Sequence, residues 1–223
     1  MFATFADNHR RESVAYKLRR KRFEDLVTML QSTPGKVHLL DIGGRPKYWE
    51  KVFHRSPHLI DKLELTLVNP RKYSSEYDNI QPLVGDGRDM RQFKDNEFDI
   101  VFSNSVIEHV GSFEDQQMMA KEVRRLGQKY LIQTPNLYFP IEPHFVFPFF
   151  QFLPVWFRVL LVQNFSLGWF SKVPDRQRAI KKVTSIRLLS KGEFQQLFPD
   201  ATIVEEKIYG LVKSFVAHTA SEA

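Results

Sequence analysis

Polar side chains and glycines follow four apolar segments of this sequence, each at the point where the segment ends. They are Asp41 with Gly43 and Gly44, Asn69, Asp86 with Gly87, and Ser103 with Asn104. Carboxylates, amides and hydroxyls bind the polar groups of a small molecule, and glycines let the backbone approach it closely. Because the carboxyl ends of neighbouring parallel strands line one crevice, the spacing predicts a single small-molecule pocket.

The elements that must position these residues form an α/β pattern. The apolar run Val37–Ile42 predicts a strand buried on both faces, and Pro46 suits the first position of the helix after the glycine turn. We expect further strands at Glu64–Val68, Ile80–Val84, Phe98–Ser103, Lys129–Thr134, Ala201–Glu206 and Leu211–His218. We expect helices over residues 8–31, Pro46–Phe53 and Glu114–Leu126, and a short one from the capping box at Ser190 that ends before Pro199. Strands that alternate with helices and end in a hairpin predict a mainly parallel sheet with one antiparallel strand.

Composition restricts the function classes. The chain has 223 residues, a net charge of +6 and no cysteine, which excludes disulfides, a thiolate nucleophile and a zinc–sulfur site. A cysteine-free chain without a secretory signal fits a cytoplasmic location. The basic clusters favour a solvated face, and contact with nucleic acid or anionic lipid is the alternative.

An aromatic-rich stretch, residues 145–170, follows the fifth predicted strand. Its prolines and polar residues exclude a spanning helix, which needs about 20 uninterrupted apolar residues. We expect a cap or lid insertion over residues 137–187, within a domain over residues 36–223 that follows a basic N-terminal helix in residues 1–35. A peripheral membrane contact through residues 145–170 is the alternative use of this stretch.

The strand-end motifs resemble those of the class I methyltransferases that use S-adenosylmethionine, in particular the type 11 small-molecule branch. The resemblance runs from about Val37 to His218 and is strongest up to Pro135. It rests on Leu39-Leu40-Asp41-Ile42-Gly43, Gly85-Asp86-Gly87, Phe98–Asn104 with Glu108-His109-Val110, Leu188–Pro199 and Gly210–Ser214. It implies a Rossmann-like sheet of seven strands with the last inserted antiparallel, and helices on both faces. It also implies an enzyme whose cofactor is S-adenosylmethionine.

For the first strand end, the resemblance implies that Asp41 and Gly43, with Gly44, hold the methionine end of the cofactor. The family pattern has a second glycine where this chain has Arg45, so the turn is bulkier and the arginine is expected to cover the cofactor. This departure leaves the strength of cofactor binding open.

For the other strand ends, the resemblance implies that Asn69 faces the ribose, where the family usually has an acid. An amide both donates and accepts hydrogen bonds, but without the strength of a charged partner. Asp86 is expected to accept from the adenine amino group and the Gly87 N–H to meet a ring nitrogen. Ser103 and Asn104 are expected near the sulfonium.

The methyl acceptor is expected to be a small molecule, a lipid-linked compound or a sugar, methylated by in-line displacement. His109 is a candidate base, because imidazole titrates near neutral pH, although a packing role is an equal alternative. Tyr138, Glu142 and His144 follow the fifth strand and are candidates to face the acceptor. Glu142 and His144 predict no metal site, because transition metals usually need three or four convergent ligands. The oligomeric state stays open.

Three other readings remain. A non-catalytic S-adenosylmethionine-binding module is favoured by Arg45 and Asn69. A nicotinamide-dependent oxidoreductase is disfavoured, because Arg45 and Pro46 interrupt the dinucleotide fingerprint. Nucleic-acid methylation is supported by the basic clusters alone, since Ser103-Asn104-Ser105-Val106 stands where such enzymes carry Asn/Asp-Pro-Pro-aromatic.

Overall fold

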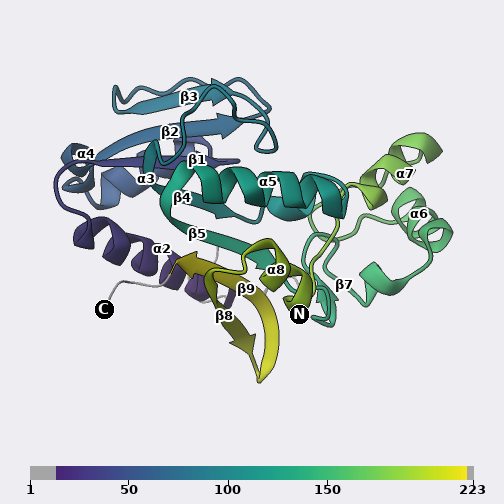
Figure 1. The fold of residues 1–223 in the computed structure, drawn as a ribbon. Coiled ribbons are helices and arrows are strands. Elements are labelled where there is room, and N and C mark those ends of the chain that lie inside the picture. Colours follow the sequence, from purple (N-terminus) through teal and green to yellow (C-terminus); the bar gives the residue numbers. More distant parts are fainter. Residues whose placement is uncertain (1–13, 220–223) are drawn as a thin grey trace.

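The computed structural model describes residues 14–219 (Figure 1). The expected N-terminal helix is observed as α2, Val14–Ser32, and the part of it predicted over residues 8–13 lies outside the described residues. The other helices are α3 Pro46–Arg55, α4 Leu59–Lys62, α5 Phe113–Leu126, α6 Val155–Asn164, α7 Arg176–Thr184, α8 Lys191–Leu197, and the 3₁₀ turns η1 Ile107–His109 and η2 Phe150–Phe152. The strands are β1 Val37–Ile42, β2 Leu63–Asn69, β3 Ile80–Val84, β4 Phe98–Asn104, β5 Gly127–Pro135, β6 Ile141–Glu142, β7 Phe147–Pro148, β8 Ala201–Ile208 and β9 Leu211–Thr219.

Seven strands form one sheet in the order β3-β2-β1-β4-β5-β9-β8. Strands β1 to β5 are mutually parallel, and β9 lies antiparallel between β5 and β8. The predicted Rossmann-like fold, with its last strand inserted antiparallel, is confirmed. Because β1, β2 and β4 are adjacent and parallel, their carboxyl ends meet at one edge, beyond which α6 and α7 lie (Figure 1).

Alternation along the strands gives the sheet two apolar faces. In β1, Leu40 and Ile42 pack into a core that includes residues of α5 and α8, whereas Val37 and Leu39 pack into a second core with residues of α2 and α3. Successive side chains of a strand point to opposite faces, so a strand buried on both sides reads as one apolar run. Helices therefore cover both faces, as expected (Figure 1).

The helix starts at α5 and α8 are fixed locally. Ser112 and Asp115 form a capping box at α5, and Ser190 and Glu193 form one at α8. In each, the serine side chain accepts from a first-turn N–H and the acid accepts from the serine N–H. The helix predicted from Ser190 is confirmed.

The segment between β5 and α8 packs around a core of its own. Its buried members are Phe145, Phe150, Val159, Val162, Ala179 and Val183, from η2, α6, α7 and the β6–β7 turn. Among residues 14–219, no helix combines the length and apolar content needed to cross a bilayer. The domain boundaries proposed above, and the cytoplasmic location, stay predictions.

Candidate functional site

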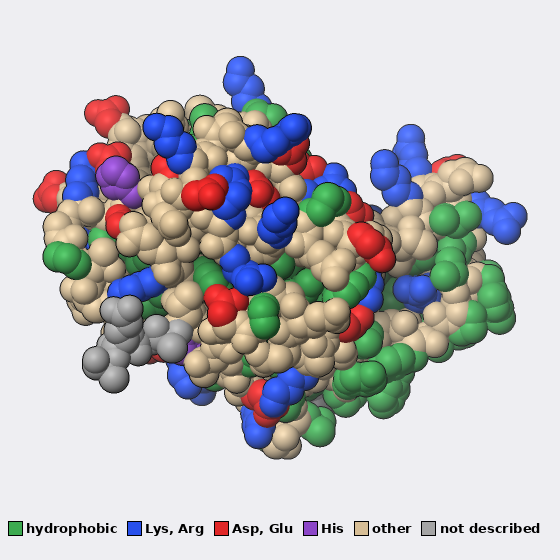
Figure 2. Space-filling view, viewed as in Figure 1, with side chains coloured by type: hydrophobic (Ala, Val, Ile, Leu, Met, Phe, Trp, Pro, Cys, Tyr) green, Lys and Arg blue, Asp and Glu red, His purple; other side chains and the backbone are tan. Residues whose placement is uncertain are grey.

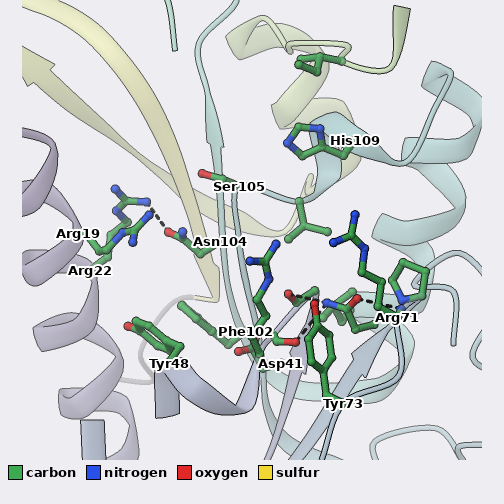
Figure 3. A pocket seen from close by; sticks show the side chains of 18 of the residues that line it. Arg19, Arg22, Asp41, Tyr48, Arg71, Tyr73, Phe102, Asn104, Ser105 and His109 are labelled. Atoms are coloured by element: carbon green, nitrogen blue, oxygen red, sulfur yellow. Dashed lines mark hydrogen bonds between the residues drawn. The ribbon is translucent and has the colours of Figure 1, made fainter. Parts of the chain in front are cut away.

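A cavity of about 720 Å³ lies at the carboxyl ends of β1, β2 and β4. Its walls come from the turn after β1, the loop after β2, the end of β4 and, from the opposite side, α2 and the segment around α7. The predicted residues among its lining are Asp41, Gly43, Gly44, Arg45, Asn69, Asn104 and His109. Four strand ends were predicted to carry the polar residues and glycines of the site. The tertiary structure brings three of them, the ends of β1, β2 and β4, to one pocket (Figure 3).

The turn after β1 requires its glycines. Gly43 has a φ of +82°, and a Cβ there would lie 2.4 Å from Cγ2 of Val106. At Gly44 a Cβ would lie 2.4 Å from Oδ2 of Asp41. A glycine at either position avoids these collisions, and because it has no side chain a ligand in the cavity can approach the backbone closely.

Asp41 is a buried acid at the end of β1. Its Oδ2 accepts a hydrogen bond of 2.8 Å from Nε1 of Trp49, which packs in the first turn of α3. Burial raises the pKa of Asp41 to about 7, although the indole hydrogen bond acts in the opposite direction. Burial thus favours the protonated form of this carboxyl group compared with an exposed aspartate.

This pKa predicts a pH dependence of stability. In the unfolded chain Asp41 titrates near its ordinary value of 3.8, so between about pH 4 and pH 7 the folded state binds more protons. The free energy of unfolding should therefore fall as the pH rises through this window. Asp41→Asn keeps an acceptor for Trp49 but removes the titration. Urea unfolding at pH 5 and pH 7.5 should show a smaller difference for this variant than for the parent, and an equal difference would contradict the assignment.

Asn69 at the end of β2 holds the glycine turn. Its Nδ2 donates to the carbonyl oxygens of Gly43 at 3.0 Å and Gly44 at 3.2 Å, and its Oδ1 accepts from the N–H of Arg71. A carboxylate at this position could not donate to the two carbonyls. The amide that departs from the family pattern therefore has a local structural reason.

Five basic side chains line the cavity: Arg19, Arg22, Arg45, Arg71 and Lys182. Among the described lining residues Asp41 is the only acid, so the cavity wall is strongly basic. Arg19 and Arg22 were not among the residues predicted for the site. The basic face of the predicted N-terminal helix was the only sequence feature that pointed to these two arginines. The hydrophobic periodicity of a helix does not indicate which strand ends the helix will cover.

Arg22 is buried against the end of β4. Its Nη1 donates to Oδ1 of Asn104 (Figure 3), and its Nε lies 3.0 Å from Oε1 of Glu206 on β8. Burial lowers the pKa of Arg22, while the charge of Glu206 counteracts that effect. Burial also lowers the pKa of nearby Lys213 to about 8, and the charge of Arg22 adds to this.

Asp86, Gly87 and Ser103 do not line the cavity. Both carboxylate oxygens of Asp86 accept from the Arg88 guanidinium, which also bonds Asp115 at 2.7 Å. These hydrogen bonds hold the pKa of Asp86 below its ordinary value. The Ser103 hydroxyl donates to the carbonyl of Ile42 inside the sheet.

Of the four residues predicted for catalysis and for the acceptor, only His109 lines the cavity. Tyr138 is 65% exposed, stacks on Phe152 and lies outside the cavity lining. Glu142 and His144 also lie outside that lining, but Nε2 of His144 is 3.2 Å from Nε2 of His109, which does line the cavity. Burial, with the neighbouring His144, lowers the pKa of His109 to about 4. Burial acts to lower the pKa of His144 as well, but the Glu142 carboxylate outweighs it and raises the pKa.

Comparisons with known proteins agree with this fold. Residues 53–129 match the family model described as a methyltransferase domain. A crystal structure from Pyrococcus horikoshii OT3 is 19% identical, covers 98% of this chain and 95% of that one, and has a TM-score of 0.54. No curated protein matches the chain.

Two solved methyltransferases have similar folds. The 1,6-didemethyltoxoflavin-N1-methyltransferase of Burkholderia thailandensis, solved with S-adenosylhomocysteine, is 10% identical over 89% of this chain and 76% of its own, with a TM-score of 0.54. The methyltransferase domain of citrinin polyketide synthase is 13% identical over 92% of this chain and 52% of its own, with a TM-score of 0.57. At identities this low, the structural likeness shows a shared fold and no more.

Proposed function

We propose, from the premise that this chain is a class I S-adenosylmethionine-dependent methyltransferase, that it methylates a small-molecule acceptor carrying an anionic group. The observation that carries the proposal is the cavity of about 720 Å³, which opens beside the glycine turn and has a basic wall. Pockets for small molecules usually measure about 300–1,000 Å³.

The residues at the turn fit the cofactor. Gly43 and Gly44 have no side chain at positions where a Cβ would collide with neighbouring atoms. Asn69 holds the turn by donating hydrogen bonds to the carbonyl oxygens of both glycines. Arg45 lines the cavity without filling it, so its side chain leaves room for a nucleoside. We assign Asp41, with this turn, to the methionine end, and Asn104 to the reacting end.

S-adenosylmethionine supplies a methyl group activated by a sulfonium, and transfer to an acceptor lone pair leaves the neutral thioether. The protein contributes to catalysis by aligning the cofactor with the acceptor, since holding the two reactants in line supplies much of the rate enhancement. His109 lines the cavity, and its lowered pKa keeps the imidazole neutral at pH 7, but a base with so low a pKa gains little from taking a proton, so we assign it no proton transfer.

The basic wall supports an anionic group on the acceptor. Arg19 lines the cavity, and its Nε is buried without a hydrogen-bond partner among the described residues. A buried guanidinium nitrogen without a partner is unfavourable, and a carboxylate or phosphate is the partner that fits it best.

The experiment has a binding part and a transfer part. Calorimetry should show binding of S-adenosylhomocysteine, and incubation of cell extract with deuteromethyl cofactor should give one labelled product by mass spectrometry. Arg19→Met should lower product formation at limiting extract by about tenfold, because a charge-assisted bond is lost, with cofactor affinity unchanged. Binding without any labelled product would favour the non-catalytic module instead, and no binding would overturn the proposal.

We also propose a peripheral membrane contact through residues 145–170. Apolar side chains gather on the surface over the region of α6 and β7 (Figure 2), and Trp156 and Leu160 are 70% and 48% exposed. Amphipathic surface helices with exposed Trp and a basic flank bind anionic bilayers, and the segment around α7 supplies the basic residues. The chain should float with phosphatidylserine vesicles. Leu160→Ser should reduce flotation, whereas Leu211→Ser, an equally exposed leucine on β9, should not; no flotation of the parent would contradict the contact.

A further inference from the structure

We propose that Glu108, His109 and His144 bind a divalent transition-metal ion beside the cavity. One ligand atom from each residue lies within 4.8 Å of the other two. The Nε2 atoms of the two histidines are 3.2 Å apart, and Oε1 of Glu108 is 3.9 Å from Nε2 of His144. Here we depart from the expectation that Glu142 and His144 form no metal site, because the fold brings Glu108 and His109 beside His144.

The ligands come from two parts of the chain. Glu108 and His109 lie in η1, directly after β4, and His144 lies in the turn between β6 and β7. The rings of the two histidines meet edge to face, with centroids 4.8 Å apart. The metal-binding set thus joins the central sheet to the segment that follows β5.

Glu108 is an unsatisfied buried acid. It has no exposed surface, and its Oε1 has no hydrogen-bond partner among the described residues. Its Oε2 accepts a hydrogen bond of 3.3 Å from Thr134. A buried carboxylate oxygen without a partner is strongly unfavourable, and here the unpartnered oxygen is directed at the two imidazoles.

Glu142 orients His144 as metal-binding histidines are usually oriented. The Nδ1 of His144 lies 2.7 Å from Oε1 of Glu142, and Oε2 of Glu142 accepts from the backbone N–H groups of His144 and Phe145. This bond places the proton on Nδ1 and leaves Nε2 as the ligand atom. A carboxylate behind a histidine is the usual support of a metal ligand.

Three acceptor atoms converge, and this number distinguishes a metal from a proton. A shared proton joins the two Nε2 atoms and leaves the Glu108 oxygen unsatisfied, whereas a metal ion satisfies all three. Bonds of about 2.0–2.2 Å set ligand atoms about 3–3.6 Å apart, so only the Glu108 carboxylate has to move slightly. Two imidazoles and one carboxylate suit zinc or iron(II) and leave open positions. Because His109 lines the cavity, a metal ion held by this set would lie beside the cavity.

The test is metal binding to the full chain, which is independent of methyl transfer. After treatment with a chelator, calorimetry with ZnCl₂ and elemental analysis should give one zinc ion per chain. His144→Ala and Glu108→Gln should each weaken binding by about 100-fold or more. His58→Ala removes an exposed histidine at the start of α4 and should change nothing.

Thermal unfolding of the metal-free variants shows whether each variant is folded before zinc is added. Glu108→Gln should leave the metal-free melting temperature unchanged or higher, because it removes a buried charge, while it abolishes the stabilisation by zinc. Zinc binding of equal strength in the parent, His144→Ala and Glu108→Gln would overturn the proposal, as would the absence of stoichiometric binding to the parent. Neither result would bear on S-adenosylhomocysteine binding, so the two proposals fail separately.

Discussion

Replacing Gly44 with alanine is expected to destabilise the fold and to weaken S-adenosylhomocysteine binding by about tenfold or more. The new Cβ would lie 2.4 Å from Oδ2 and 2.5 Å from Cγ of Asp41. Asp41 is held by Trp49, so it cannot move aside without breaking that buried hydrogen bond. Forcing atoms into such a site typically costs about 1–3 kcal/mol, and here the displaced carboxyl also lines the cavity.

The matched control is Gly192→Ala in α8. A Cβ at Gly192 meets nothing within 4 Å. Alanine favours a helix over glycine, so this variant should be unchanged or more stable by up to about 1 kcal/mol. Urea unfolding measures the free energy of unfolding of both variants, and calorimetry measures their affinity for S-adenosylhomocysteine. If both variants retain parental values, the turn after β1 does not have the tight geometry described.

Replacing Arg22 with methionine should destabilise the fold by about 3–5 kcal/mol, which is the usual effect of breaking one partner of a buried ion pair. Arg22 and Glu206 have side chains that are only 6% and 5% exposed. Without Arg22, the carboxylate of Glu206 keeps the hydroxyl of Ser214 as a partner but loses its counter-charge. Asn104 also loses its donor at the cavity wall.

Two controls isolate the buried charge. Arg20→Met removes the exposed Arg20–Glu24 pair, whose side chains are 71% and 58% exposed, and should have no measurable effect on unfolding. The double variant Arg22→Met with Glu206→Met removes both buried charges and should recover much of the loss, since burying neither charge avoids the desolvation cost. A double variant as unstable as Arg22→Met alone would show that packing, and not charge, fixes α2 against β8.

The cofactor turn was predictable because its determinants are local. The apolar run Val37–Ile42 and the glycines after it specify a buried strand and a tight turn through backbone sterics alone. Likewise, the serine and the acid three residues later predicted the start of α8 at Ser190. Each of these interactions joins residues close in the chain, so the spacing of residue types was sufficient.

The basic wall was not predictable, because it depends on how a helix docks. The sequence indicated an amphipathic basic helix, but periodicity specifies only which side of a helix is apolar. The docking of α2 beside β4 and β8 is what brings Arg22 to Asn104 and Glu206. The same docking places Arg19 at the cavity.

By itself, the sequence determined the α/β class, the strand bounds to within a few residues, the antiparallel last strand implied by its family resemblance, and the glycine turn. Only the tertiary structure decided that His144 meets Glu108 and His109 across 35 positions of the chain, and that Asp86 pairs with Arg88 outside the cavity. The physical reason is range. Strand, turn and cap preferences act between near neighbours, whereas the meeting of distant polar side chains follows from packing that the whole core fixes at once.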